Sequence, residues 1–391
     1  MRICMIAYTF YESDGRVLMY AEALSKRGDH VDVIALSRER QPFLEHLNSV
    51  NVYRIQKRTY NEKGKLSYAV KLVRFLINSG LLLTRQHLKE PYDLIHVHSV
   101  PDFEVFAGLI PKLNGAKIIL DIHDIIPEFF AAKFNQAKNS LMFNLLVLVE
   151  KISCAFSDHV IIANDLWQKR LISRSVSEDA CSVILNYPDP EMFHPLPKAR
   201  KDDRFVIVYP GSLNWHQGLD IAIKAFNHIK DAIPMAVLDI YGQGGEKKEL
   251  LCLISKLELE NRIFIKQNVP TRAIPQIIAN ADLGIVPKRA VSFGNEAFST
   301  KILEFMAVGV PVLVSATKVD QYYFSDSLVK FFRPGDYIDM AENILLLSKD
   351  KKLRKNLTKN ALKFIETNNW GVKKRQYFKI IDSLTKKSSC S

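Results

Sequence analysis

The chain has 391 residues, 48% of them apolar, and a formal net charge of +12. At roughly 150 residues per domain this length corresponds to two or three domains, and the apolar fraction is that of a globular protein with sizeable cores. These values exclude disorder, collagen and a coiled coil as descriptions of the whole chain.

Neither a membrane span nor a secretion signal is expected. No apolar stretch approaches the roughly 20 residues that a membrane-spanning helix requires, and the first residues lack the small-residue cleavage site of a signal peptide. The five cysteines are scattered, without metal-binding spacing. We therefore expect a cytoplasmic protein with reduced thiols.

The positive charge is concentrated in two segments. Residues 53–90 hold nine Lys and Arg against two Asp and Glu, and residues 330–391 hold fifteen against six, so the remaining residues together carry a net charge of −4. Nucleic acid, an anionic membrane surface and plain solvated helix faces are all compatible with such segments.

In the first half of the chain, short apolar runs alternate with helical segments. Strands are predicted at residues 2–8, 30–36, 93–97, 117–121, 159–162 and 182–185. Helices are predicted at residues 15–27, 65–88, 102–113, 139–157 and 164–173. This alternation indicates a parallel sheet with helical crossovers.

The second half repeats the pattern after a proline-rich linker. Four prolines between Pro188 and Pro197 cannot lie in a helix interior or a central strand. Strands are then predicted at residues 205–209, 236–241, 262–265, 283–286 and 310–314, with a helix at 219–230 and further helices between the strands. The tail from about residue 336 is predicted to form successive charged helices.

The predicted fold class is therefore α/β, with two Rossmann-like, doubly wound domains that face each other across a cleft. In such sheets ligands bind outside the carboxyl ends of the strands, so the loops that follow the strands are the candidate functional regions.

Residues 292–314 contain the most informative motif. Glu296 is expected in a loop, and Glu304 follows inside an amphipathic helix that begins near Ser299. The backbone N–H groups of Ser299 and Thr300 would be free at the start of that helix, which creates an anion site. Lys301 adds a cation in the first turn, where a bound anion would explain it.

This block strongly resembles the family 4 retaining glycosyltransferases of the GT-B fold. Their signature is Glu-x7-Glu at the start of a helix, followed by a Met-Ala-x-Gly-x-Pro turn. The residues that match the turn are Met306, Ala307, Gly309 and Pro311. The resemblance implies a retaining, metal-independent transferase that moves a sugar from a nucleoside-diphosphate sugar, UDP- or GDP-linked, to a glycan or lipid-linked acceptor in polysaccharide biosynthesis, without a cofactor.

The resemblance also implies roles for individual residues. Glu296 would contact hydroxyls of the donor sugar and Glu304 the ribose, because carboxylates accept paired hydrogen bonds from vicinal diols. The backbone amides that would hold the diphosphate belong to Phe298, Ser299 and Thr300. The alternative is that Glu304 is a solvated helix residue and Glu296 a surface loop charge.

Two further loops match regions that border the nucleotide in this family. Asn268 and Val269 correspond to the loop beside the base. Gly242 lies in a loop that is either a base or phosphate contact or a plain turn.

In one loop the chain departs from the family, whose members often carry an Arg and a Lys after the first strand of the second domain. The residues found there are Gly211, Ser212, His216 and Gln217, and the first three are still expected to contact the donor. Other groups must then neutralise the leaving diphosphate. The candidates, in order, begin with Lys301 and Arg289, and also include Lys288 and His216. A solvated helix lysine is the alternative for Lys301.

In the first half, His123 and Asp124 follow a strand and resemble the family's His-Asp motif, in which the His lies near the donor sugar. Asp124 would orient the ring or meet an acceptor hydroxyl. His98 is a weaker candidate at another strand end, and His96 is expected to be buried structure. The residues of the entry loop that are candidates for cleft contacts are Asp14, Gly15 and Arg16.

The catalytic residues are thus expected to be Glu296, His123, Lys301 and Asp124. No Asp-x-Asp metal motif ends a strand. The alternatives are a sugar-nucleotide epimerase or a phosphorolytic enzyme on the same fold, or a non-enzymatic nucleic-acid binder; the last lacks the aromatic-interleaved basic motifs of RNA modules.

The expected domains are an acceptor-binding domain at residues 1–190 and a nucleotide-sugar-binding domain at residues 191–370. In the fold that the chain resembles, the last helix, here residues 371–391, crosses back to the first domain. We expect no nucleic-acid partner. Segments 53–90 and 330–391 instead favour peripheral binding to an anionic membrane.

Overall fold

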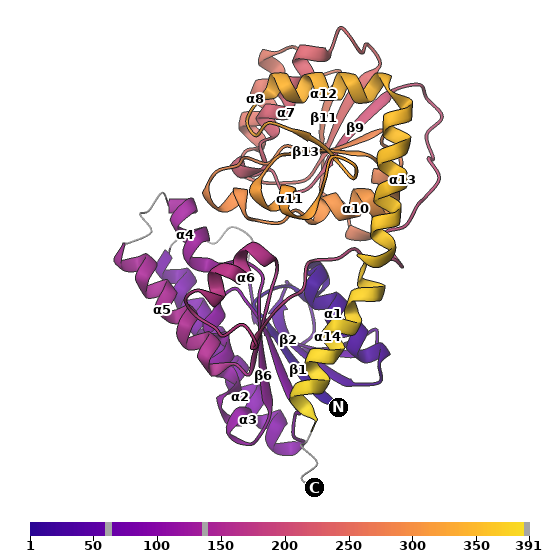
Figure 1. Cartoon of the computed structure of the whole chain (residues 1–391). Coiled ribbons are helices and arrows are strands. Elements are labelled where there is room, and N and C mark those ends of the chain that lie inside the picture. Colours follow the sequence, from indigo (N-terminus) through magenta and orange to yellow (C-terminus); the bar gives the residue numbers. More distant parts are fainter. Residues whose placement is uncertain (59–64, 135–139, 387–391) are drawn as a thin grey trace. The chain divides into compact units, whose positions relative to one another are not determined.

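A computed structural model describes residues 1–58, 65–134 and 140–386 (Figure 1). Its contacts divide the chain into two units. Unit 1 comprises Met1–Asn186 together with the chain from Lys374 onward, and unit 2 comprises Tyr187–Lys373. These boundaries lie within four residues of the positions drawn from the sequence, and most of the proline-rich linker belongs to unit 2.

Unit 1 contains an eight-stranded sheet. Its strands are β1 (Arg2–Ala7), β2 (His30–Ser37), β3 (Leu44–Leu47), β4 (Val50–Lys57), β5 (Leu94–His98), β6 (Lys117–Ile122), β7 (His159–Ile162) and β8 (Cys181–Val183). Their order across the sheet is β3-β4-β2-β1-β5-β6-β7-β8, and all neighbours are parallel except β3 and β4. The predicted parallel sheet is confirmed.

The antiparallel pair of β3 and β4 was not predicted. β4 does alternate, with Val50 and Val52 buried between half-buried neighbours, but its next two inward positions hold Arg54 and Gln56. Arg54 is paired there through Nη2 with Glu12 and Glu45. These inward polar residues interrupt the apolar alternation of residues 50–57. The stretch was therefore interpreted as part of a basic segment and not as a strand.

Helices cover both faces of this sheet. The α-helices are α1 (Gly15–Lys26), α2 (Lys65–Lys89), α3 (Leu109–Leu113), α4 (Ile126–Phe134), α5 (Leu141–Phe156), α6 (Asp165–Ile172) and α14 (Trp370–Thr385), and the 3₁₀ helices are η1 (Tyr11–Ser13) and η2 (Asp102–Gly108). Helices α2, α3 and α5 lie on one side of the sheet, and α1 and the end of α14 lie on the other (Figure 1).

Two helical predictions need correction. Residues 102–113, predicted as one helix, form η2 followed by the short α3, because Pro111 lacks an N–H and is tolerated only in a first helical turn. Helix α4 was missed. Pro127 stands in its first turn, where proline is compatible with a helix start, but no helix was predicted for this stretch.

Unit 2 contains a six-stranded parallel sheet. Its strands are β9 (Phe205–Pro210), β10 (Ala236–Tyr241), β11 (Ile263–Lys266), β12 (Leu283–Val286), β13 (Val312–Ser315) and β14 (Lys330–Phe332), in the order β11-β10-β9-β12-β13-β14. Only the edge strand β14 was not predicted; three residues are too few to show a periodicity.

The helices of unit 2 follow its strands. They are α7 (Leu219–Ile229), α8 (Lys247–Lys256), α9 (Ile274–Ala279), α10 (Thr300–Val308), α11 (Lys318–Tyr323), α12 (Tyr337–Lys349) and α13 (Lys351–Thr367), with 3₁₀ helices η3 (Trp215–Gln217), η4 (Thr271–Ala273) and η5 (Ser292–Asn295). The charged helices predicted for the tail are therefore present as α12, α13 and α14.

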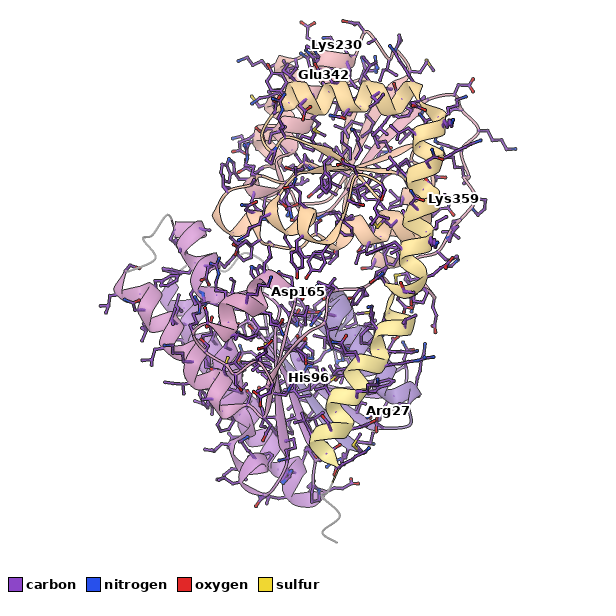
Figure 2. The ribbon with its side chains drawn as sticks, in the orientation of Figure 1. Arg27, His96, Asp165, Lys230, Glu342 and Lys359 are labelled. Carbon is purple, nitrogen blue, oxygen red and sulfur yellow. The ribbon has the colours of Figure 1, made fainter. Side chains whose placement is uncertain are left out.

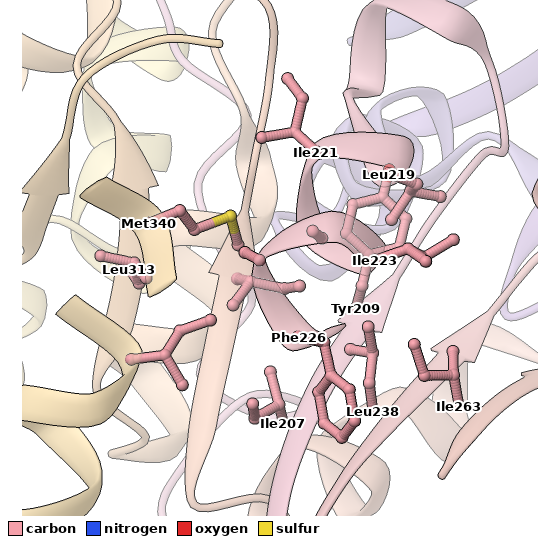
Figure 3. Packing of buried hydrophobic residues seen from close by; sticks show 14 of the residues in the cluster. Ile207, Tyr209, Leu219, Ile221, Ile223, Phe226, Leu238, Ile263, Leu313 and Met340 are labelled. Carbon is pink, nitrogen blue, oxygen red and sulfur yellow. The ribbon is translucent and has the colours of Figure 1, made fainter. Parts of the chain in front are cut away.

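Two apolar cores hold the helices of unit 2 against its sheet. In the first, Ile223 and Phe226 of α7 pack over the sheet residues Ile207 and Leu238 (Figure 3). In the second, α10 packs on the opposite face of the sheet through Ile302 and Phe305. The Phe305 ring lies against Gly284 of β12, where a Cβ atom would come within 2.4 Å of it. This close packing fixes where the start of α10 lies.

Each sheet has one point where the strand order reverses, between β1 and β5 in unit 1 and between β9 and β12 in unit 2. Ligands bind at such points in open α/β sheets. Across the described residues, no helix combines the length and apolarity needed to cross a membrane.

Candidate functional site

The start of α10 is the main polar feature at the carboxyl edge of the unit 2 sheet. Ser299 is its N-cap, but its hydroxyl makes no capping bond and is buried without a hydrogen-bond partner among the described residues. Thr300 follows as the first helical residue and is half-buried. Because the first N–H groups of a helix lack intrahelical acceptors, this end offers several donors and one unsatisfied hydroxyl to an anion.

Lys301 adds positive charge to this end. Its side chain lies over Gly211, where a Cβ atom would be 2.3 Å from its Cε, and its Nζ is 5.3 Å from the centre of the Tyr209 ring. Within the described part of the chain, no carboxylate pairs with it. Burial lowers the pKa of Lys301, with Glu304 opposing and Lys288 adding to the shift. The lysine is therefore a desolvated cation that a bound anion would stabilise.

The other cations proposed for this role are already paired. Lys288 is buried and contacts Asp320 at 2.8 Å and the Ala297 carbonyl at 2.7 Å. Arg289 donates to Asp220 at 2.6 Å. Both therefore support the loop that precedes α10.

His216 lies in a positive field. Burial lowers its pKa, and the charges of Lys301 and Lys288 lower it further. The ring nitrogen Nε2 lies 3.0 Å from Nε2 of the Gln217 amide. The same positive field that disfavours a charged His216 favours an anion at this edge of the sheet.

The two glutamates of the motif flank the start of α10. Glu296 follows η5 and has Lys318 at 3.3 Å, on the exposed start of α11. Glu304 lies one turn into α10 and is half-buried. Burial raises the pKa of Glu304, while Lys301 and a hydrogen bond from Thr300 lower it. Glu304 and Lys301, three residues apart, share one side of the helix.

The ring of Phe298 is part of an aromatic cluster. Its ring packs edge to face against Tyr323, with ring centres 5.1 Å apart, and also contacts Phe324. These aromatic contacts hold the chain that leads into α10, so the Phe298 amide is positioned by packing behind it.

The loops after β9 and β10 are packed tightly together. The Gly211 amide donates to the Tyr241 carbonyl at 2.8 Å, and a Cβ atom on Gly242 would lie 1.8 Å from the Gly211 carbonyl oxygen. Glycine at 242 is thus required by backbone contact, whether or not a ligand touches it. Ser212 is exposed, and its carbonyl accepts a hydrogen bond from the Tyr209 hydroxyl at 3.0 Å.

Asn268 and Val269 lie farther along the sheet, in the loop that follows β11. Asn268 is exposed and Val269 is half-buried. The strand order places this loop at the carboxyl edge, two strands from β9.

In unit 1, a buried ion pair organises the carboxyl ends of the strands. Arg16 donates through Nε and Nη2 to the two carboxylate oxygens of Asp121, each at 2.7 Å, and through Nη1 to the Ile184 carbonyl and the Asn186 side chain. Arg16 is 5% exposed and Asp121 is fully buried. Every guanidinium nitrogen of Arg16 is used inside the unit, so its role is to hold Asp121.

Asp121 in turn contacts two histidines. Its Oδ2 lies 3.1 Å from His98 Nδ1 and 3.3 Å from His123 Nε2. Burial alone would raise the pKa of Asp121, but the charges of Arg16 and His123 hold it well below its usual range. Burial disfavours charged His123, yet Asp121 and Asp14 raise its pKa. The pKa of His98 is lowered by burial.

Asp124 stands apart from this cluster. Burial raises its pKa and the charge of His123 lowers it. The carboxylate that lies within contact distance of the His123 ring is that of Asp121. Successive side chains on a strand alternate between faces, so the spacing of two between Asp121 and His123 was the signal that could have identified this pair.

His96, His98 and Asp121 are the one set of described residues whose spacing would suit a metal ion, with ligand atoms within 4.8 Å of one another. His96 lies in the interior of unit 1 (Figure 2), as expected, and its Nδ1 is 2.7 Å from the Tyr377 hydroxyl. Both oxygens of Asp121 already bind Arg16, whose charge would repel a cation. The donor set therefore fits an ion-paired cluster rather than a metal centre.

A cavity of about 230 Å³ opens beside this cluster at the ends of β1 and β5. Its lining includes Asp14, Arg58, Tyr68 and His98. Asp14 also caps α1 by accepting from the Val17 amide at 3.2 Å. Asp14 and His98 were predicted from the sequence as candidates, whereas Arg58 and Tyr68 were not. The strand that brings Arg58 to the cavity was itself not predicted. Gly15, the first residue of α1, is exposed with open space beside it.

Two models of known protein families match the chain. Residues 194–364 match the family model described as Glycosyl transferases group 1, and residues 16–191 match Glycosyltransferase Family 4. The chain is a family 4 glycosyltransferase with the GT-B fold, as the resemblance implied.

One curated relative and two solved structures are similar to this chain over nearly its full length. The chain is 23% identical to the N,N'-diacetylbacillosaminyl-diphospho-undecaprenol alpha-1,3-N-acetylgalactosaminyltransferase of Campylobacter jejuni, covering 93% of this chain and 94% of the relative. Sucrose-phosphate synthase from Thermosynechococcus elongatus has a TM-score of 0.80 at 19% identity, covering 98% and 99%. Anabaena HepE, solved with UDP and glucose, has a TM-score of 0.74 at 19% identity, covering 98% and 100%.

Proposed function

We propose that this glycosyltransferase moves a sugar, with retention of anomeric configuration, from a UDP- or GDP-linked donor to a lipid-linked or glycan acceptor. The observation that carries the proposal is the start of α10, between the two glutamates of the motif. Among the described residues, the buried Ser299 hydroxyl has no hydrogen-bond partner there and Lys301 has no carboxylate in an ion pair with it. An anionic ligand is the group that such an arrangement stabilises.

The donor is proposed to bind unit 2. Its diphosphate would accept hydrogen bonds from the backbone of Phe298–Thr300 and from the Ser299 hydroxyl, with Lys301 neutralising the charge that develops on departure. Glu304 would bind the ribose and Glu296 the sugar hydroxyls. HepE, a structure of the same fold, was solved with UDP and glucose, which supports a nucleoside diphosphate here.

The acceptor is proposed to bind unit 1, at the cavity beside His98 and His123. Asp121 orients both rings, and His123 would contact the reacting sugar. The name of the Campylobacter jejuni relative includes a diphospho-undecaprenol acceptor. A lipid-linked acceptor, together with the basic segments 53–90 and 330–391, supports action at an anionic membrane surface.

For retention we propose front-face transfer. The bond between the anomeric carbon and the diphosphate oxygen breaks, the acceptor oxygen bonds to that carbon on the same face, and the acceptor proton passes to a phosphate oxygen. This route needs no pair of carboxylates about 5 Å apart, unlike a retaining glycosidase. Lys301 and the helix start would supply the positive charge that a metal supplies elsewhere, so we propose that no metal is required.

The proposal can be tested by donor binding. Replacing Lys301 by Met should weaken UDP or GDP binding by about 10- to 100-fold, the range for losing a charged hydrogen bond. Lys359→Met, an exposed lysine on α13 (Figure 2), is the matched control and should bind like the parent protein. Isothermal titration would measure both, with and without EDTA; equal binding by the two variants would contradict the assignment of the anion site.

A further inference from the structure

Unit 1 carries an apolar surface that its own fold does not cover. More than half of the exposed large apolar side chains among the described residues belong to four of its helices. We define this apolar face as Val70, Val73, Ile77, Leu81 and Leu88 of α2, Leu109, Ile110 and Leu113 of α3, Phe129 and Phe134 of α4, and Leu141, Met142, Leu145, Leu148 and Ile152 of α5.

These helices are neighbours, so the exposed residues form one region. Helices α2 and α5 both pack on η2: the backbone of Ala107 lies 3.6 Å from where a Cβ atom on Gly80 would be, and the rings of Phe106 and Phe156 are 5.1 Å apart. Helices α2, α3 and α5 lie on the same side of the sheet (Figure 1). Exposed apolar side chains gathered on neighbouring helices of one side indicate an interaction surface.

The exposed residues also follow helical periodicity. On α2 the apolar positions 70, 73, 77, 81 and 88 recur at intervals of three, four or seven, and on α5 positions 141, 145, 148 and 152 do the same. Both helices therefore have an inner apolar stripe that packs on the sheet and an outer one that contacts solvent.

The charges on these helices are of one sign at the surface. All four acidic residues of α2, η2, α3, α4 and α5 are buried: they are Asp102, Glu104, Glu128 and Glu150. Glu128 and Glu150 are both ion-paired with Arg174. The charged side chains of these helices that are described as exposed are all basic: Arg74, Arg85, Lys89 and Lys151.

We propose that the apolar face docks on an anionic lipid leaflet, with its leucines and isoleucines in the interface and its arginines and lysines at the headgroups. Long basic side chains beside an apolar stripe suit this arrangement because their stems bury while their charges reach the headgroups. A second copy of the chain fits less well, since a two-fold contact would bring Arg74 and Arg85 together, and the described residues of these helices offer no exposed acid to pair with them. The exposed Glu90, just after α2, already lies 3.6 Å from Arg2.

The inference deepens the proposed function, and rests on it only for the lipid-linked acceptor that docking would bring within reach. It also moves the expected membrane contact from the two basic segments to the apolar face. The sequence pointed to the basic segments alone, whereas the structure points to a surface in which α5, a helix outside both segments, contributes as many apolar side chains as α2.

Vesicle flotation tests the docking surface. Ile77→Gln combined with Leu148→Gln removes one side chain from each outer stripe, at positions 55% and 51% exposed. The control combines Leu251→Gln with Leu346→Gln on unit 2, at positions 47% and 42% exposed. With vesicles containing phosphatidylglycerol, we expect the parent and the control to float and the Ile77/Leu148 variant to partition about ten-fold more weakly.

Three results would overturn the inference: no flotation of the parent protein, equal flotation of both double variants, or a dimer that the Ile77/Leu148 variant dissociates while vesicle binding is absent. Thermal unfolding of the variants and a second pair, Leu81→Gln with Leu145→Gln, guard against misfolding. Sugar transfer to acceptor dispersed in detergent is measured in parallel. Its loss in all proteins would refute the proposed function while leaving the docking result intact.

Discussion

At the scale of single residues, the carboxyl edge of unit 1 is governed by one buried ion pair. Arg16 donates to both oxygens of Asp121, whose charge raises the pKa of His123, while burial lowers the pKa of His98. A buried pair of this kind is strongly destabilising to break because it leaves an uncompensated charge. Arg16 is therefore best understood as the residue that positions Asp121, and Asp121 as the residue that sets the state of the two histidines.

A second buried acid in unit 1 predicts a pH dependence. Glu104 is fully buried, neither of its oxygens has a partner among the described residues, and burial raises its pKa to about 8. Between the pKa of about 4.3 in the unfolded chain and this folded value, folding takes up a proton. Its contribution to the free energy of unfolding therefore falls as pH rises through that window.

Glu104→Gln should remove this dependence. Relative to the parent protein, the variant should gain roughly 2 to 4 kcal/mol of unfolding free energy between pH 5 and pH 9. Urea denaturation at several pH values measures this difference. Parallel curves for the two proteins would show that the carboxyl group does not titrate in the window, against the expectation from its burial.

At the scale of elements, the loops after β9 and β10 depend on backbone contact that only glycine permits. Gly242 has a positive φ and lies against the Gly211 carbonyl, while Gly245 in the same loop has nothing near its Cβ position. We expect Gly242→Ala to destabilise unit 2 by about 2 kcal/mol or more, since both strain and overlap arise. Gly245→Ala should stay within about 0.5 kcal/mol. Chemical denaturation compares them, and similar values for the two would refute the close-packing explanation.

The elements also show what the sequence could predict. Most of the parallel strands, with β4 and β14 as exceptions, were predicted because they are buried on both faces and read as continuous apolar runs. β4 was missed because Arg54 and Gln56 fill inward positions, and their partners come from distant residues. The motif around Glu296 and Glu304 was found because its spacing is local. The sequence could not predict that Lys288 and Arg289 are ion-paired, because their partners, Asp320 and Asp220, are distant from them in sequence.

At the scale of the whole molecule, the last helix, α14, packs against residues from the start of the chain within unit 1. Tyr377 of α14 is fully buried, its hydroxyl lies 2.7 Å from His96, and its ring centre is 4.3 Å from that of Tyr20. Arg27 also donates to Asp382 at 2.9 Å. The sequence alone could not show these contacts, since they join residues nearly three hundred or more positions apart.

Removing this anchor should weaken unit 1. Tyr377→Ala is expected to lower its unfolding free energy by about 3 to 5 kcal/mol, the range for deleting a large buried aromatic side chain. Lys379→Ala, two residues along the same helix and exposed, is the control and should have little effect. Hydrogen exchange of β1 and β5 reports on unit 1 directly; unchanged protection in Tyr377→Ala would mean that α14 contributes little to its stability.

The net charge of +12 is also best explained at this scale. Part of it stands beside the apolar face of unit 1, and part lies on the exposed lysines of α12–α14. The loop where related enzymes carry cations holds Ser212 and Gln217, and Lys301 on the facing helix takes their place in the proposed site. The positive charge is therefore divided between the surface of the chain and the proposed anion site at the start of α10.

The most direct test of the account is sugar transfer by the purified protein and by Glu296→Gln, with Glu342→Gln on the exposed side of α12 as control. Nucleoside diphosphate release would be followed across a panel of UDP- and GDP-sugars with a lipid-linked acceptor, and the product's anomeric configuration determined by NMR. We predict one efficient donor, retained configuration, and turnover reduced about 100-fold or more in Glu296→Gln alone. Turnover by Glu296→Gln equal to that of the parent protein, or an inverted product, would contradict it.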